Sequence, residues 1–146
     1  MDIAEIKQML KSAARNLFEN QPTIYDFTPE SGRSEWNLAH HLANEIMKLC
    51  PSLDCDLEIP KRNIKNKRPD IILHRRGTHE DNRLVVEVKT DRTHGEIDSD
   101  IDKVKTDWFQ SKLCYQFGSV VHLKDNKTAD VKVFQNERYS PLQNTF

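Results

Sequence analysis

Apolar residues in the first third of the chain recur every three or four positions, which is the spacing of an amphipathic helix. One such pattern predicts a helix over Asp2–Phe18, with Ile3, Ile6, Leu10, Ala13 and Leu17 on its apolar side. A second pattern predicts a helix over Ser34–Leu49, with Ser34 as its N-terminal cap. A polar connection that contains a proline, Glu19–Arg33, separates the two helices.

Apolar residues in the rest of the chain alternate with polar ones or form short runs, which is typical of strands. We expect strands near Leu53–Ile59, Asp70–His74, Glu87, Phe117–Leu123 and Val131–Phe134. A helical pattern from about Glu96 to Tyr115 lies between the third and fourth strands, so these two strands can be parallel neighbours joined by a crossover. The expected order is α-α-β-β-β-α-β-β, an α/β fold with a mixed central sheet.

Candidate chemistry lies in two of these strands. The segment from Arg75 to Asn82 is rich in residues that favour a chain reversal, so the flanking strands should pair as an antiparallel hairpin. That pairing brings Asp70, directly after Pro69, beside Glu87. Successive side chains of a strand point to opposite faces, so Glu87 and Lys89 share one face.

Two adjacent carboxylates and a neighbouring amine suit phosphate chemistry. The carboxylates repel each other unless a cation lies between them, and their hard oxygens favour Mg²⁺, with Mn²⁺ as a substitute. The Lys89 ammonium can orient a metal-bound water and offset negative charge that develops on a phosphate. This set predicts a divalent-metal nuclease site.

The acid-x-Lys pattern also occurs at Glu5–Lys7, Asp125–Lys127 and Asp130–Lys132, so context must separate the candidates. Glu5 and Lys7 lie in a helical pattern, where residues two apart do not face each other. Asp125–Lys127 lies in a polar turn, and the strand before Asp130 offers no partner carboxylate. The strand pair that carries Asp70 and Glu87 is therefore preferred.

With Pro69, Asp70, Glu87 and Lys89 in this arrangement, the chain resembles the PD-(D/E)xK nuclease superfamily, which includes restriction endonucleases and archaeal Holliday junction resolvases. The resemblance implies a restriction endonuclease-like core over residues 34–135, a mixed sheet flanked by helices, and metal-dependent phosphodiester cleavage. Residues 1–33 would then be an accessory helix and connection, and residues 136–146 an irregular tail, within a single domain. The resemblance also implies an extra acid on the helix before the first strand.

Glu35 is the candidate for that extra acid. At about 100° per residue, Glu35 projects to the middle of an apolar arc, so its carboxylate should point inward. The arc is formed by Leu38, Ala39, Leu42, Ile46 and Leu49. The alternative is that Glu35 only stabilises the positive end of the helix dipole. Glu45 is the competing acid, but it lies nearer the flank of the arc and late in the helix, and Glu35 is preferred.

Charge is distributed locally. The formal net charge is −1, so overall charge does not attract nucleic acid. Basic residues nevertheless surround the strand of Asp70 and could contact phosphates: Lys61, Arg62, Lys65, Lys67, Arg68, Arg75 and Arg76. An ordinary solvated loop is the alternative reading of such a charge run.

Length and cysteine content limit the remaining choices. A chain of 146 residues suits one domain, and its size is compatible with a homodimer. Three cysteines without C-x-x-C spacing indicate reduced core residues rather than disulfides or zinc. A stretch of roughly 20 apolar residues and a signal-like N-terminus are both missing from the sequence, so a cytoplasmic protein without membrane contact is expected.

The sequence thus predicts a Mg²⁺-dependent endonuclease, with DNA rather than RNA as the expected substrate. Asp70 and Glu87 would bind the metal directly, the Val88 carbonyl could add a ligand, and Glu35 would act through water or a second ion. Lys89 would position the attacking water. Two alternatives remain open: a catalytically silent nuclease fold used as a DNA-binding or assembly module, and a ribonuclease or toxin-like effector.

Overall fold

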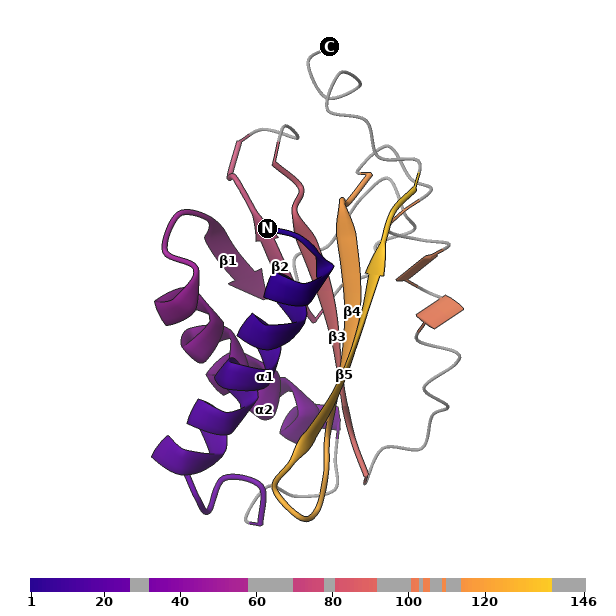
Figure 1. Ribbon diagram of the computed structural model, residues 1–146. Coiled ribbons are helices and arrows are strands. Elements are labelled where there is room, and N and C mark those ends of the chain that lie inside the picture. Colours follow the sequence, from indigo (N-terminus) through magenta and orange to yellow (C-terminus); the bar gives the residue numbers. More distant parts are fainter. Residues whose placement is uncertain are drawn as a thin grey trace.

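The computed structural model describes residues 1–26, 32–57, 70–77, 81–91, 101–102, 104–105, 109 and 114–137, with the side chains of 32–35 excepted. Two helices and five strands follow one another in the order α1-α2-β1-β2-β3-β4-β5 (Figure 1). The expected helix between β3 and β4 falls largely outside the described residues. Residues 58–69, which include five of the seven basic candidates, and the tail beyond residue 137 also lie outside the described part.

Helix α1 spans Ile3–Asn20 and helix α2 spans Gly32–Leu49. Asp2 caps α1: its carboxylate accepts the N–H of Glu5, and the Glu5 carboxylate accepts the N–H of Asp2 in return. The first helix therefore begins where the sequence predicts. The second begins two residues before the predicted cap, so Ser34 lies within the helix and the prediction that it is the cap is wrong.

The strands form one mixed sheet in the spatial order β1-β2-β3-β4-β5. Their bounds are β1 Asp54–Leu57, β2 Ile71–His74, β3 Leu84–Thr90, β4 Phe117–Leu123 and β5 Ala129–Gln135. Strands β3 and β4 are parallel, and every other neighbouring pair is antiparallel. Both the β2–β3 hairpin and the mixed sheet were expected from the sequence, and the pairing confirms them.

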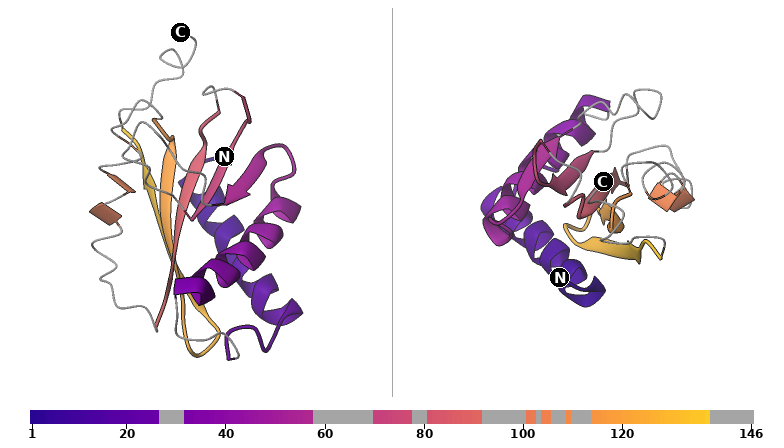
Figure 2. Two further views of the ribbon diagram at one scale, coloured as in Figure 1. Left: turned by 180° about the vertical axis from the view of Figure 1, so that it is seen from behind. Right: turned by 90° about the horizontal axis from the view of Figure 1, so that it is seen from above.

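One face of the sheet, called the helix face below, is covered by α1 and α2 (Figures 1 and 2). Alternate strand residues supply its core, among them Leu73, Val86, Val88 and Val121, and helix residues such as Leu10, Leu42 and Ile46 complete it. All of these are at most 2% exposed in the folded chain. Because α1 contributes as much to this core as α2, it is an integral layer rather than an accessory element.

The opposite side of the sheet, called the open face below, has a smaller apolar cluster formed by Ile72, Val85, Val104, Phe109 and Tyr115. The described residues of the segment between β3 and β4 supply Val104 and Phe109. They approach β4 so closely that a Cβ atom at position 118 would clash with a Val104 methyl carbon, which explains why this position is glycine.

Two further predictions can be compared with the fold. Cys114 has a φ of 45° and, like Tyr115, lies outside any helix, so the predicted helix does not extend to Tyr115. Cys50, Cys55 and Cys114 are free thiols, as expected, and burial raises the pKa of Cys55 to about 12. In the part of the chain that the structure describes, neither helix is long and apolar enough to cross a bilayer.

Candidate functional site

The candidate site lies where the pairing of β2 with β3 ends. The last register pair is Ile71 with Val86, so Asp70 follows as the next residue, opposite Glu87. Beyond that pair, a side chain replaces the strand as hydrogen-bond partner: the Val88 N–H donates to the Asp70 carboxylate over 2.7 Å. The structure therefore brings Asp70 against the Glu87-Val88-Lys89 segment.

The residues of β3 divide between the two faces. Val86 and Val88 enter the core on the helix face, whereas Val85 belongs to the cluster on the open face. Strand alternation therefore places Glu87 and Lys89 on the open face. Glu87 is only 3% exposed and Lys89 is partly exposed, so the carboxylate is held close to the sheet while the lysine reaches toward solvent.

Glu35 is described by its backbone alone, which lies in the first turn of α2. Leu38 and Leu42 of the same helix pack on the helix face. Because the Glu35 side chain lies outside the described part, its role beside Glu87 stays a prediction.

Glu45, the competing acid of α2, is engaged elsewhere. Its carboxylate accepts hydrogen bonds from the Asn20 amide at 3.2 Å and the Lys48 ammonium at 3.1 Å. It therefore ties α2 to α1. Among the described side chains, which exclude that of Glu35, no three His, Cys, Asp or Glu residues are grouped to hold a metal ion.

Only two of the seven predicted phosphate-binding residues are described, and both are paired with acids. Arg75 lies 3.1 Å from Asp81, and Arg76 makes two hydrogen bonds to Asp56, at 2.9 Å and 2.6 Å. Their positive charge is thus compensated within the chain. Lys61, Arg62, Lys65, Lys67 and Arg68 lie outside the described residues.

The structure adds a polar network that sequence reasoning missed. His74 is 7% exposed, and its Nε2 lies 2.6 Å from a carboxylate oxygen of Asp56. The hydrogen bonds from Arg76 are the largest cause that lowers the pKa of Asp56, to about 2. The alternation of Asp54 and Asp56 along β1 was the available signal, but such residues usually face solvent.

A second missed pair lies at the other side of Lys89. His122 of β4 is the register partner of Lys89, and its Nε2 lies 2.6 Å from a carboxylate oxygen of Asp91. Asp91 directly follows β3, two positions after Lys89. The sequence distance between Asp91 and His122 hid this contact, because only the parallel pairing of β3 with β4 brings them together.

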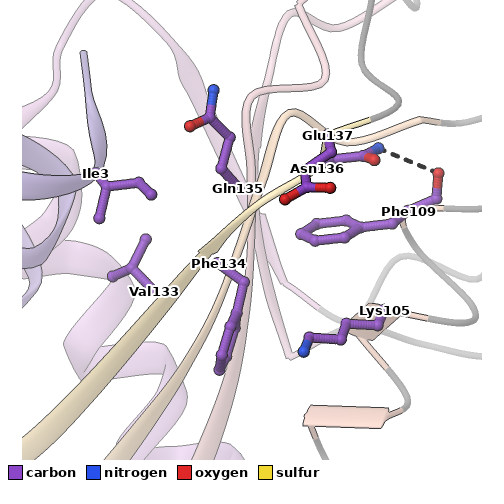
Figure 3. Close-up of a pocket in the computed structure, with 8 residues that line it drawn as sticks. All are labelled: Ile3, Lys105, Phe109, Val133, Phe134, Gln135, Asn136 and Glu137. Carbon is purple, nitrogen blue, oxygen red and sulfur yellow. Dashed lines mark hydrogen bonds between the residues drawn. The ribbon is translucent and has the colours of Figure 1, made fainter.

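A pocket elsewhere on the molecule is not part of this site. It has a volume of about 610 Å³ and lies along the end of β5, with Phe134, Asn136, Phe109 and Lys105 in its lining (Figure 3). The Asn136 amide donates to the Phe109 carbonyl across it, over 3.2 Å. Because Gln135 at this end pairs with Phe117 and not with His122, the pocket lies toward the end of the sheet away from Lys89.

Comparison of the chain with protein-family models, with curated proteins and with solved structures finds no match in any of the three. The function is therefore inferred from the residue types and from the arrangement of the described side chains around β3.

Proposed function

We propose that this protein is a metal-dependent nuclease that hydrolyses phosphodiester bonds in DNA with a metal-activated water. The observation that carries the proposal is the 2.7 Å hydrogen bond from the Val88 N–H to the Asp70 carboxylate. It ties the first acid of the candidate motif to the segment that holds the second acid and the lysine. Residues from two separate parts of the sequence are thereby brought together at one place on the sheet.

The donor atoms suit Mg²⁺. Asp70 and Glu87 would hold the ion through carboxylate oxygens, with the Val88 carbonyl as an added ligand and Glu35 acting through water or a second ion. When bound, Mg²⁺ would act as a Lewis acid and make a coordinated water easier to deprotonate. Mn²⁺ would substitute, because it accepts the same oxygen ligands.

Glu87, Lys89 and Asp70 would each have a separate role in the proposed reaction. Glu87, nearly buried on β3, keeps its carboxylate in one place and thus limits the entropy lost on ligand binding. Lys89, two residues further on the same face, would orient the attacking water and offset the charge that grows on the phosphate in the transition state. Asp70 is oriented by the backbone N–H of Val88.

DNA would be held mainly by the basic residues between β1 and β2. Arg75 and Arg76 are already paired with Asp81 and Asp56, so breaking these pairs would oppose their use on phosphates. The first contacts are therefore expected from the other five basic residues: Lys61, Arg62, Lys65, Lys67 and Arg68. Such contacts release counterions, so affinity should fall steeply as salt concentration rises.

The decisive experiment is nicking of a supercoiled plasmid in Mg²⁺ or Mn²⁺, with EDTA as a blank, by wild-type protein and Asp70→Asn. The asparagine keeps an oxygen that can accept the Val88 N–H but removes the negative charge, so the fold should persist while metal affinity falls. We expect cleavage to drop by about 100-fold. Equal cleavage by both proteins would identify a contaminant and overturn the proposal.

A lysine pair supplies the matched control. Lys89→Ala should retain DNA binding and lose cleavage, whereas Lys132→Ala should cleave like wild type. Lys132 belongs to the second acid-x-Lys tripeptide on a strand, and its Asp130 is already paired with Lys124 at 2.6 Å. Loss of cleavage in both variants would mean that general positive charge matters, not the position of Lys89.

Substrate type separates the proposal from its alternatives. Single-stranded, duplex and branched DNA and an RNA of matched sequence are incubated in parallel with wild-type protein. Cleavage of RNA alone would favour a ribonuclease. Binding of DNA without turnover in any metal would favour a catalytically silent module.

A further inference from the structure

A second group of polar side chains lies beside Lys89, where β3 and β4 end. In the parallel pairing of these strands, Lys89 is opposite His122 and Thr90 is opposite Leu123. Register partners on neighbouring strands direct their side chains to the same face of a sheet. His122 therefore shares the open face with Lys89 and Glu87.

The His122 ring is held by a carboxylate that is itself fixed. Asp91 accepts the N–H of Asp125 at 2.7 Å through one oxygen, and its other oxygen lies 2.6 Å from Nε2 of His122. The Asp125 N–H is the largest cause that keeps the pKa of Asp91 low, so the carboxylate is ionised at neutral pH. A charged partner of this kind fixes both the ring orientation and the tautomer.

Tyr25 anchors Asp91 and Asp125 to the core through hydrogen bonds. This tyrosine is 1% exposed, its hydroxyl donates to the Asp125 carboxylate at 2.8 Å, and its oxygen accepts the Asp91 N–H at 3.3 Å. A buried side chain from the α1–α2 connection therefore sets the position of Asp91. The His122 ring is thus positioned through Asp91 by elements from three parts of the chain.

One edge of the ring remains for a ligand. With Nε2 directed at Asp91, Nδ1 lies on the other edge, and within the described part of the chain Asp91 is the only hydrogen-bond partner of the ring. The His122 side chain is 17% exposed. Among the described residues, the charged groups on its face include Asp91, Lys89 and Glu87 from the β3 side, and Lys132 together with the ion pair of Lys124 and Asp130 from the β5 side.

We propose that His122 contacts substrate in the proposed nuclease site, with Nδ1–H donating to an oxygen of the phosphate group that Lys89 contacts. Asp91 is then a positioning residue that acts through His122. Because Nε2–H is directed at Asp91, donation from Nδ1 takes place in the ring that has a proton on each nitrogen, and charge-assisted hydrogen bonds are the strong ones. The inference rests on the proposed function for its ligand, the nucleic-acid backbone.

The alternative is that the contact between His122 and Asp91 is purely structural and holds β4 against the end of β3. Two substitutions distinguish these roles, because each keeps a hydrogen-bonding group near the position of one ring nitrogen. His122→Asn places its amide near the position of Nδ1 and keeps a donor for phosphate. His122→Gln reaches the position of Nε2 and keeps the bond to Asp91. If His122 contacts phosphate, His122→Asn should bind DNA more tightly than His122→Gln. If the contact with Asp91 is purely structural, His122→Gln should be closer to wild type.

The experiment measures the affinity of wild type, His122→Ala, His122→Gln and His122→Asn for a short labelled DNA duplex in Ca²⁺, which occupies carboxylate sites. The KM and kcat for cleavage are then measured in Mg²⁺, and thermal unfolding is followed as the test of folding. We expect Ala and Gln to weaken binding and raise KM about tenfold, and Asn to recover most of this loss. The unfolding temperature should be lower for Asn than for Gln, so affinity and stability rank the two variants in opposite order.

The outcomes separate this inference from the proposed function. If wild type cleaves DNA and Asp70→Asn does not, but Gln binds as well as wild type, the inference about His122 fails alone. If wild type binds DNA without cleaving it and Asn binds better than Gln, the nuclease proposal fails and the phosphate contact stands. If wild type neither binds nor cleaves nucleic acid, both fail.

Discussion

The helix face and the open face of the sheet use alternate residues of the same strands for opposite purposes. On β3, Val86 and Val88 enter the core beneath α1 and α2, while Glu87 and Lys89, the residues between and beyond them, emerge on the other side. The helix face is mainly apolar, and most of its side chains on β2, β3 and β4 are buried. Its strand residues therefore specify the fold, which leaves the intervening positions free to carry charge.

The open face itself changes character along β3. Val85, near the beginning of the strand, packs in an apolar cluster with Val104 and Phe109, whereas Glu87 and Lys89, nearer its end, have polar neighbours such as Asp70 and His122. Buried charge is costly without polar partners. The proposed site thus lies on the part of the open face where hydrogen-bonding groups replace the apolar cluster.

The largest expected effect tests the helix face. Leu42→Ala removes a side chain with no exposed surface and should lower the free energy of unfolding by about 2–5 kcal/mol. Leu49→Ala, at the end of the same helix, is the control because Leu49 is 42% exposed, and it should change stability by less than about 0.5 kcal/mol. Urea denaturation measures both, and equal losses would contradict the assignment of the core.

A smaller loss of stability is expected at the apolar part of the open face. Gly118→Ala inserts a methyl group against Val104 and Phe109 and should cost about 1–3 kcal/mol. Val104→Ala removes the methyl groups that it would meet, so the double variant should be more stable than the sum of the two single losses predicts. Strict additivity in denaturation experiments would show that the two residues do not touch.

The proposed water-mediated role of Glu35 leads to a graded prediction for catalysis. Glu35→Gln should slow plasmid nicking by about tenfold, because a group that acts through water contributes less than a direct ligand, whereas Asp70→Asn should slow it by about 100-fold. Initial rates over a range of Mg²⁺ concentrations compare them. A loss in Glu35→Gln as large as that in Asp70→Asn would indicate that Glu35 is a direct ligand.

The smallest effect concerns pH and the polar network of β1. Because the pKa of Asp56 is about 2 in the folded protein and lies below its ordinary value, its ionised form stabilises the fold above about pH 4. That stabilisation should be lost as pH falls from about 4 toward 2. Asp56→Asn should be less stable than wild type at pH 7 and lose less stability over the acid range, as thermal unfolding can measure. Parallel curves for both proteins would contradict a role for Asp56.

Much of the fold follows from local patterns, and errors concentrate where several elements must meet. The hydrophobic periods predicted both helices and all five strands, and Phe117–Leu123 matches β4 at both ends. The same reasoning did not predict the burial of His74, and it treated α1 as accessory. Burial of His74 depends on the Asp56 side chain of another strand, and the role of α1 depends on contacts with α2 and β5. Neither is encoded in spacing along the chain.

Strand alternation can be read from the sequence, and it indicates that Glu87 and Lys89 share a face and that a hairpin brings Asp70 beside them. Which face this is, the covering of the other face by α2, and the contact of Asp91 with His122 emerge only in the folded chain. Alternation is a local property of an extended backbone, whereas the choice of covering layer and the pairing of distant strands depend on how the whole chain buries its apolar surface.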